Sequence, residues 1–258
     1  MEELKSRARI EDEHAESASA RNISTTAGAN ASPEAPQRSP ALASPDPPRA
    51  TALHRATSLG PQPRAPAADL SAAARAIEAF LTALGHAPNS DPQLANTGAL
   101  VAEAFHDEFL SGYRTSPAEV LSESVAASGG DLIVVRGIAI TCMCPHHLLP
   151  SSGVVHVAYV PTTKVAGLGA LSRLAQCLSR RLVLQETFCE QMAHALETEL
   201  LAAGSGCIAE LSAACLCARG ERQTQARVVS VATRGTLQSD AQLRSEFFAC
   251  ARLHTGAP

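Results

Sequence analysis

The stretch that most constrains this chain is residues 141–150, where two thiols and two imidazoles stand within six positions of an apolar, strand-like segment. They belong to Cys142, Cys144, His146 and His147, and a second thiol pair, Cys215 and Cys217, follows about seventy residues later. Zn²⁺ is bound by a few Cys and His side chains, and a catalytic zinc site uses three protein ligands and leaves the fourth position open for water. A Cys-x-x-His element with one distant Cys would supply that set, so the pattern predicts a metal centre.

Two other interpretations of these residues stay open at this point. A free cysteine commonly behaves as a small core hydrophobe, although adjacent imidazoles need polar partners if they are buried. A closed structural site is also compatible with the spacing, because each Cys-x-Cys pair would put both thiols on one face of a strand. Its ligands would be Cys142, Cys144, Cys215 and Cys217. That arrangement leaves the two histidines without a task.

Residues 1–66 differ from the rest of the chain. They hold nine of the sixteen prolines, no aromatic residue and no cysteine. Such a segment buries too little apolar area to offset the entropy of ordering, so we predict that it is disordered. Its first residues lack the apolar run of a signal peptide, and no window approaches the roughly 18 apolar residues that span a bilayer. We therefore expect no membrane partner.

The remaining residues, 67–258, are predicted to form one folded domain. All eight aromatic residues and all eight cysteines lie between Phe80 and Cys250, and a stretch of about 190 residues can support a single core. Eight thiols without a secretory signal are typical of a protein of the reducing cytoplasm. The net charge of −4 and the lack of a basic stripe argue against a nucleic-acid partner.

Hydrophobic periodicity predicts an α+β domain with a helical part over 67–130 and a core over 131–258. In the helical part, a first helix runs from the N-cap Asp69 to a stop at Gly85, and a second covers about 98–110. In the core we expect strands at 131–144 and 153–160 joined by a loop at 150–152, helices at 168–181 and 185–203, strands at 206–218 and 227–233, and a last helix at 240–253. This order predicts an antiparallel sheet with both central helices on one face. Its open edges favour a ring-like oligomer closed by strand pairing.

Several separated motifs follow one another along the chain: Cys144-Pro145-His146-His147, residues 155–161, residues 167–173, residues 179–186, residues 215–220, and residues 244–248. Their order and spacing, over about residues 69–253, resemble those of the GTP cyclohydrolase I family. The resemblance implies the ββααββ tunnelling fold with an N-terminal helical extension. It also implies a zinc enzyme that converts GTP and water to formate and 7,8-dihydroneopterin triphosphate, the first step of folate and pterin biosynthesis. The family forms rings with active sites between subunits, so the resemblance implies a homo-oligomer, a decamer of two stacked rings.

The resemblance also implies roles for individual residues. Cys144, His147 and Cys215 match the zinc ligands, and His146 matches the histidine that moves protons at the purine ring. Zinc would activate water for attack on C8 of guanine, and an imidazole with a pKa near working pH could protonate N7.

Four further positions match the substrate pocket of the family. Glu186 matches the carboxylate that reads the guanine edge, with Gln185 as its catalytic neighbour, and Arg173 and Arg219 match phosphate-binding cations. For Glu186, a structural interpretation as an acid at a helix start stays open, because the helix dipole favours a negative charge there.

The chain departs from the family pattern at several positions. Pro145 replaces an acid, Ala213 a histidine, Gly169-Ala170 a Ser-Lys pair, and Leu100 an arginine. Because cations supply most of the affinity for a triphosphate, losing two of them weakens the case for GTP itself. Two alternatives therefore stand beside a GTP cyclohydrolase: a zinc hydrolase of the same fold acting on a purine nucleotide with fewer phosphates or on a pterin, and a non-catalytic zinc-bound regulatory subunit.

Overall fold

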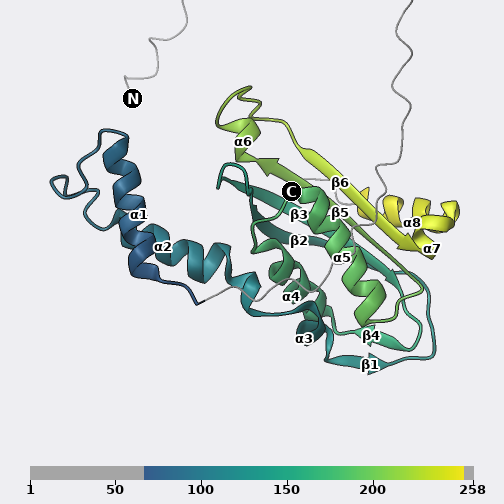
Figure 1. Cartoon of the computed structure of the whole chain (residues 1–258). Helices are drawn as coiled ribbons and strands as arrows, with labels where there is room; N and C mark the ends of the chain where they lie inside the picture. The colour runs from purple at the N-terminus through teal and green to yellow at the C-terminus, as the bar shows by residue number, and fades with distance from the viewer. Residues whose placement is uncertain (1–66, 253–258) are drawn as a thin grey trace, which may run out of the picture. The chain divides into compact units, whose positions relative to one another are not determined.

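The computed structural model describes residues 67–252 (Figure 1). The predicted disorder of residues 1–66 lies outside the described residues. No helix in the described range is long and apolar enough to cross a membrane. The α+β class is confirmed, since helices and antiparallel strands both build the domain.

The N-terminal part is helical, as its periodicity predicts. Helix α1 spans Leu70–Ala83, and the carboxylate of Asp69 caps it by accepting a hydrogen bond from the Ala72 N–H at 2.9 Å. Helix α2 (Thr97–Glu103) runs into a π-helical turn, η1 (Ala104–Phe109), and a 3₁₀ turn, η2 (Ser111–Arg114), so the single helix predicted over 98–110 changes its winding. Helix α3 (Pro117–Leu121) follows with a capping box.

Four antiparallel strands form the main sheet, in the order β2 (Ile133–Met143), β3 (Pro150–Val160), β5 (Gly204–Ala213) and β6 (Val228–Gly235). The predicted loop at 150–152 is wrong, because these residues pair with Met143, Cys142 and Thr141 as the start of β3. Pro150 is tolerated there because the first residue of a strand can lack an N–H donor. The connection between β2 and β3 is therefore residues 144–149. A small second sheet, β1 (Ser124–Ala126) with β4 (Lys164–Ala166), was not predicted.

Helices α4 (Leu168–Ser179) and α5 (Gln185–Glu199) pack on one face of the main sheet and close the core with it. Alternate strand residues such as Val155 and Val157 are fully buried against Leu171 and Phe188. The short helices α7 (Thr236–Ser239) and α8 (Ala241–Arg252) cover part of the opposite face, where Phe247 packs on Ala158 in a smaller cluster.

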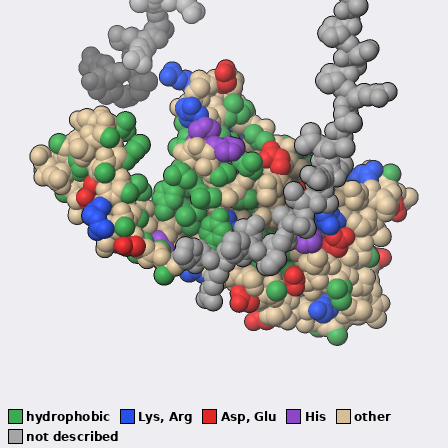
Figure 2. All heavy atoms as spheres, in the orientation of Figure 1, with side chains coloured by type: hydrophobic (Ala, Val, Ile, Leu, Met, Phe, Trp, Pro, Cys, Tyr) green, Lys and Arg blue, Asp and Glu red, His purple; other side chains and the backbone are tan. Residues whose placement is uncertain are grey.

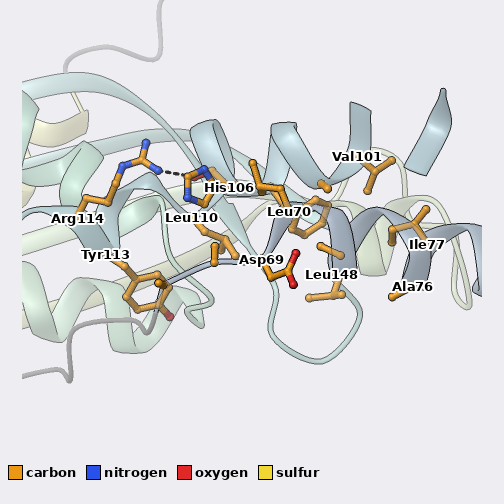
Figure 3. Close-up of a pocket in the computed structure, with 15 residues that line it drawn as sticks. Asp69, Leu70, Ala76, Ile77, Val101, His106, Leu110, Tyr113, Arg114 and Leu148 are labelled. Atoms are coloured by element: carbon orange, nitrogen blue, oxygen red, sulfur yellow. Dashed lines mark hydrogen bonds between the residues drawn. The ribbon is translucent and has the colours of Figure 1, made fainter. Parts of the chain in front are cut away.

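Hydrophobic side chains remain exposed on the N-terminal helices, as Figure 2 shows. Phe80, Leu84 and Leu100 are each at least 60% exposed, and α1 has no buried residue. The same helices line an apolar cavity of about 740 Å³, and Leu148 also lines it (Figure 3). An amphipathic helix in this state lacks the packing that normally stabilises helices in proteins.

Candidate metal centre

The register of the sheet brings two remote segments to the same end of the domain. Cys142, Ser151 and Ala213 lie opposite one another across β2, β3 and β5. Strands β2 and β5 run in the same direction, because each is antiparallel to β3. Cys144, one residue beyond the end of β2, and Cys215, two residues beyond the end of β5, therefore meet at the same end of these strands.

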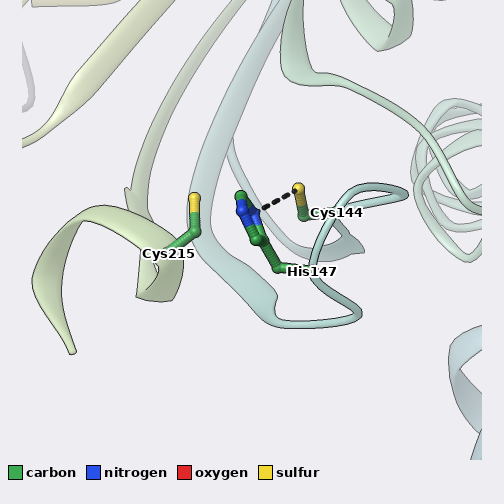
Figure 4. A group of neighbouring side chains, drawn as sticks. All are labelled: Cys144, His147 and Cys215. Atoms are coloured by element: carbon green, nitrogen blue, oxygen red, sulfur yellow. Dashed lines mark hydrogen bonds between the residues drawn. The ribbon is translucent and has the colours of Figure 1, made fainter. Parts of the chain in front are cut away.

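The loop after β2 supplies a third ligand. The Cys144 N–H donates to the Leu149 carbonyl at 3.0 Å and the Leu148 N–H to the Cys144 carbonyl at 2.9 Å, which folds residues 144–149 into a tight turn. Leu148 has φ +50°, a left-handed conformation that few non-glycine residues adopt. The turn directs His147 back between the two thiols (Figure 4).

The ligand atoms of Cys144, His147 and Cys215 all lie within 4.8 Å of one another, and Cys144 Sγ is 3.8 Å from His147 Nδ1. Tetrahedral zinc, with Zn–S of about 2.3 Å and Zn–N of about 2.0 Å, separates such atoms by about 3.5–3.8 Å. Two thiolates and an imidazole are also the donors that zinc prefers. Cys144 is only 9% exposed whereas His147 is exposed, so one side of the group faces solvent. The three residues fit an open zinc site.

The closed four-cysteine site is wrong. Cys215 and Cys217 stand on a short helix, α6 (Ala214–Cys217), rather than on a strand, and side chains two apart on a helix point in different directions. Cys217 Sγ instead lies 3.4 Å from Ser212 Oγ. Burial, and secondarily Cys189, raises the pKa of Cys142 to about 12, which disfavours the thiolate that a metal requires. In residues 67–252, Cys144, His147 and Cys215 are the one group with metal-site geometry.

His146 stands beside this group without joining it. Its ring is exposed, and its centroid lies 6.2 Å from that of His147, with the two planes at 88°. An exposed imidazole next to a metal site can exchange protons with solvent and with a bound ligand. Its catalytic role stays a prediction.

The two predicted guanine-pocket residues, Gln185 and Glu186, are the first two residues of helix α5. The Gln185 side-chain amide donates to the Ala209 carbonyl at 2.9 Å and to the Val228 carbonyl at 2.8 Å, so it ties the helix start to β5 and β6. Only its oxygen is left for a ligand. Glu186 is exposed in the first turn, where the helix dipole stabilises a carboxylate. Both the structural and the binding interpretation of Glu186 are compatible with this position.

The two predicted phosphate-binding cations lie at the surface. Arg173 on α4 forms an ion pair with Glu123 at 3.1 Å, with side chains 56% and 79% exposed. Arg219 is exposed just beyond α6, four residues after Cys215. Their binding roles stay predictions.

One support of the site was not predicted. The connector between α4 and α5 runs beside the end of β2: Leu182 forms a parallel bridge with Met143, and the Val183 N–H donates to the Met143 carbonyl at 3.2 Å. Met143 directly precedes Cys144. The apolar run 182–184 after two arginines was the only local signal, and it does not say which strand the connector joins.

Comparison with known proteins agrees with this geometry. The model of the GTP cyclohydrolase I family matches residues 73–252. GTP cyclohydrolase 1 of Chromobacterium violaceum is 36% identical over 180 residues, covering 69% of this chain and 86% of the relative. The proteins of that name from Campylobacter concisus and Corynebacterium glutamicum are 37% and 36% identical, over 67% and 72% of this chain and 90% and 95% of their own length. The chain therefore belongs to the GTP cyclohydrolase I family.

Proposed function

We propose that this protein is a zinc-dependent GTP cyclohydrolase I, which converts GTP and water to formate and 7,8-dihydroneopterin triphosphate. The observation that carries the proposal is the convergence of Cys144, His147 and Cys215, with 3.8 Å between Cys144 Sγ and His147 Nδ1, in a chain whose relatives bear that name. When bound, zinc lowers the pKa of water so that hydroxide becomes available near neutral pH.

The chain's own residues would then supply proton transfer. His146 would give a proton to N7 of guanine as water adds to C8, since its exposed ring adjoins His147. Because N7 accepts the proton, no negative charge stays on that nitrogen after the addition. The ring then opens as the new C8 hydroxyl becomes a carbonyl and its proton goes to the nitrogen that leaves, and a second water hydrolyses the resulting formamide to release formate.

Binding and orientation fall to residues around the site. Glu186 would accept hydrogen bonds from the guanine edge, and the Gln185 amide oxygen would lie beside it, because its nitrogen already binds β5 and β6. Arg173 and Arg219 would hold phosphate oxygens. The ion pair of Arg173 with Glu123 is exposed, and pairs of this kind exchange at a cost of about 1 kcal/mol or less.

A substrate with fewer phosphates is the second candidate. Leu100 is neutral and 62% exposed, and Gly169 and Ala170 begin α4 with no charged atom of their own. A Cβ placed on Gly169 would lie 3.2 Å from Arg173 Nη1, so the arginine occupies the space beside it. The third candidate, a non-catalytic regulatory subunit, rests on Pro145 and Ala213, because neither side chain can transfer a proton. Ala213 is the last residue of β5, two positions before Cys215.

The proposal includes assembly into a homo-oligomer, a decamer of stacked rings, located in the cytoplasm. Within residues 67–252, β2 and β6 are the edge strands of the main sheet and could pair with a strand of another subunit, and α1 has an apolar surface with no buried residue. All eight cysteines are free thiols, as expected in a reducing compartment.

The direct test is to incubate zinc-loaded protein separately with GTP, GMP and guanosine while following formate release and pterin fluorescence. We expect formate from GTP and none from the Cys144→Ser variant. Formate from GMP at an equal or higher kcat/KM would establish the second candidate. Formate from none of the three, with one zinc bound per chain, would favour the regulatory subunit.

A further inference from the structure

Arg181 is a buried cation in the connector between α4 and α5, with 5% of its surface exposed. Burying a charge is costly unless hydrogen bonds surround it. The guanidinium donates hydrogen bonds to backbone carbonyls of two segments, residues 112–115 and helix α4. Nε donates to the carbonyls of Gly112 (3.1 Å) and Cys177 (2.8 Å), while Nη2 donates to those of Gly112 (2.9 Å) and Thr115 (3.0 Å) and to Cys177 Sγ (3.2 Å).

The turn η2 makes further contacts with Arg181 and with the connector. The Tyr113 ring lies 5.5 Å from the guanidinium carbon, a cation–π distance, and its hydroxyl accepts a hydrogen bond from the Leu182 N–H at 3.3 Å. The Gly112 N–H donates to the Arg180 carbonyl at 3.0 Å. A Cβ on Gly112 would collide with the Cys177 carbonyl oxygen, so the two segments are in close contact. Arg181 therefore fixes the connector to η2.

This clamp is linked by backbone contacts to the metal centre. The two residues after Arg181, Leu182 and Val183, pair with Met143, and Met143 is 2% exposed and directly precedes Cys144. A displacement of the connector would therefore move the end of β2 and with it the Cys144 thiol. Metal affinity depends on ligand positions held within about 0.5 Å by their supporting residues.

We propose that Arg181 is a positioning residue of the metal centre: it fixes the connector to η2 and α4, so that Leu182 and Val183 hold the end of β2, and with it Cys144 Sγ, at binding distance from His147 and Cys215. This inference rests on the proposed metal centre. Lysine cannot replace Arg181, because a single ammonium does not span the carbonyls that the planar guanidinium bridges. Loss of residues that support metal ligands typically costs about 10–100-fold in metal affinity.

The experiment measures Co²⁺ affinity by chelator competition, together with the visible absorption of the bound Co²⁺, in the full chain. Arg181→Met and Arg181→Lys should each bind Co²⁺ about 10-fold more weakly than the unmodified protein, with an altered spectrum. The matched control is Arg180→Met, because this neighbouring arginine is exposed and its Nε donates only to Gln176 Oε1, at 2.9 Å. It should bind Co²⁺ like the unmodified protein.

Three outcomes are decisive. If the unmodified protein does not bind one Co²⁺ per chain, the metal centre itself is refuted. If it binds Co²⁺ and both Arg181 variants match its affinity and spectrum while melting at lower temperature, Arg181 only stabilises the fold and the inference is refuted. If neither variant folds, Tyr113→Phe decides: it removes only the hydroxyl that holds the Leu182 N–H, and unchanged Co²⁺ affinity would refute the clamp.

Discussion

Zinc removal should lower the melting temperature by an amount that the geometry of the site lets us anticipate. Cys144 and His147 come from the 144–149 turn and Cys215 from α6, about seventy residues later, so the three ligands converge only in the folded state. Zinc therefore stabilises the native state alone. At a free zinc concentration 1,000 times the dissociation constant this linkage is worth about 4 kcal/mol. For a domain of this size, about 2–4 °C per kcal/mol converts it to roughly 8–16 °C.

The assay compares melting curves with and without chelator for the unmodified protein and two variants. Cys144→Ser should lose most of this shift. Cys217→Ser is the matched control, because its thiol lies beside Ser212 rather than in the ligand group, and it should keep the shift. If Cys144→Ser kept its zinc and its shift while Cys217→Ser lost both, the ligand assignment would be wrong.

Three further predictions address catalysis, pH and assembly. With Ala213 unable to move protons, ring opening should outrun ring closure, so that a pyrimidine intermediate accumulates before the fluorescent pterin. Ala213→His should accelerate only the later steps by about 10²–10⁴-fold, and His146→Ala should stop the first, whereas equal rates of GTP loss and pterin gain would contradict this. Burial raises the pKa of the Cys142 thiol from 9.0 to about 12, so between these pH values the unfolded chain ionises this thiol while the folded protein keeps it protonated. The free energy of unfolding should therefore fall as pH rises from about 9 to 12. In urea unfolding, the free energy of unfolding of Cys142→Ala should fall by about 2 kcal/mol less than that of the unmodified protein between pH 8 and about pH 10.5. The protein without residues 1–66 should still sediment as a large oligomer. A monomer at micromolar concentration would contradict the proposed assembly.

Local patterns in the sequence determined most elements and one half of the site. The Asp69 cap of α1 and the apolar periods of α4 and α5 involve neighbours within a few positions, so they can be read without knowledge of the fold. The spacing of Cys144 and His147 is equally local, because a turn of four residues brings them together wherever it lies. Family resemblance supplied the remaining partner, Cys215, whose proximity no local pattern implies.

Tertiary structure alone decided where these pieces meet. The register sets Cys142 opposite Ser151 and Ser151 opposite Ala213, and so brings Cys144 and Cys215 together where β2 and β5 end. Register depends on pairings between residues far apart in sequence. The apolar pattern predicted one strand over residues 206–218, whereas β5 ends at Ala213 and the next four residues form α6. It could not reveal that Arg181 is buried, since a charged residue is read as exposed until the carbonyls that surround it are known. Short-range preferences are written in consecutive residues, whereas the position of a ligand is set by contacts across the whole sheet.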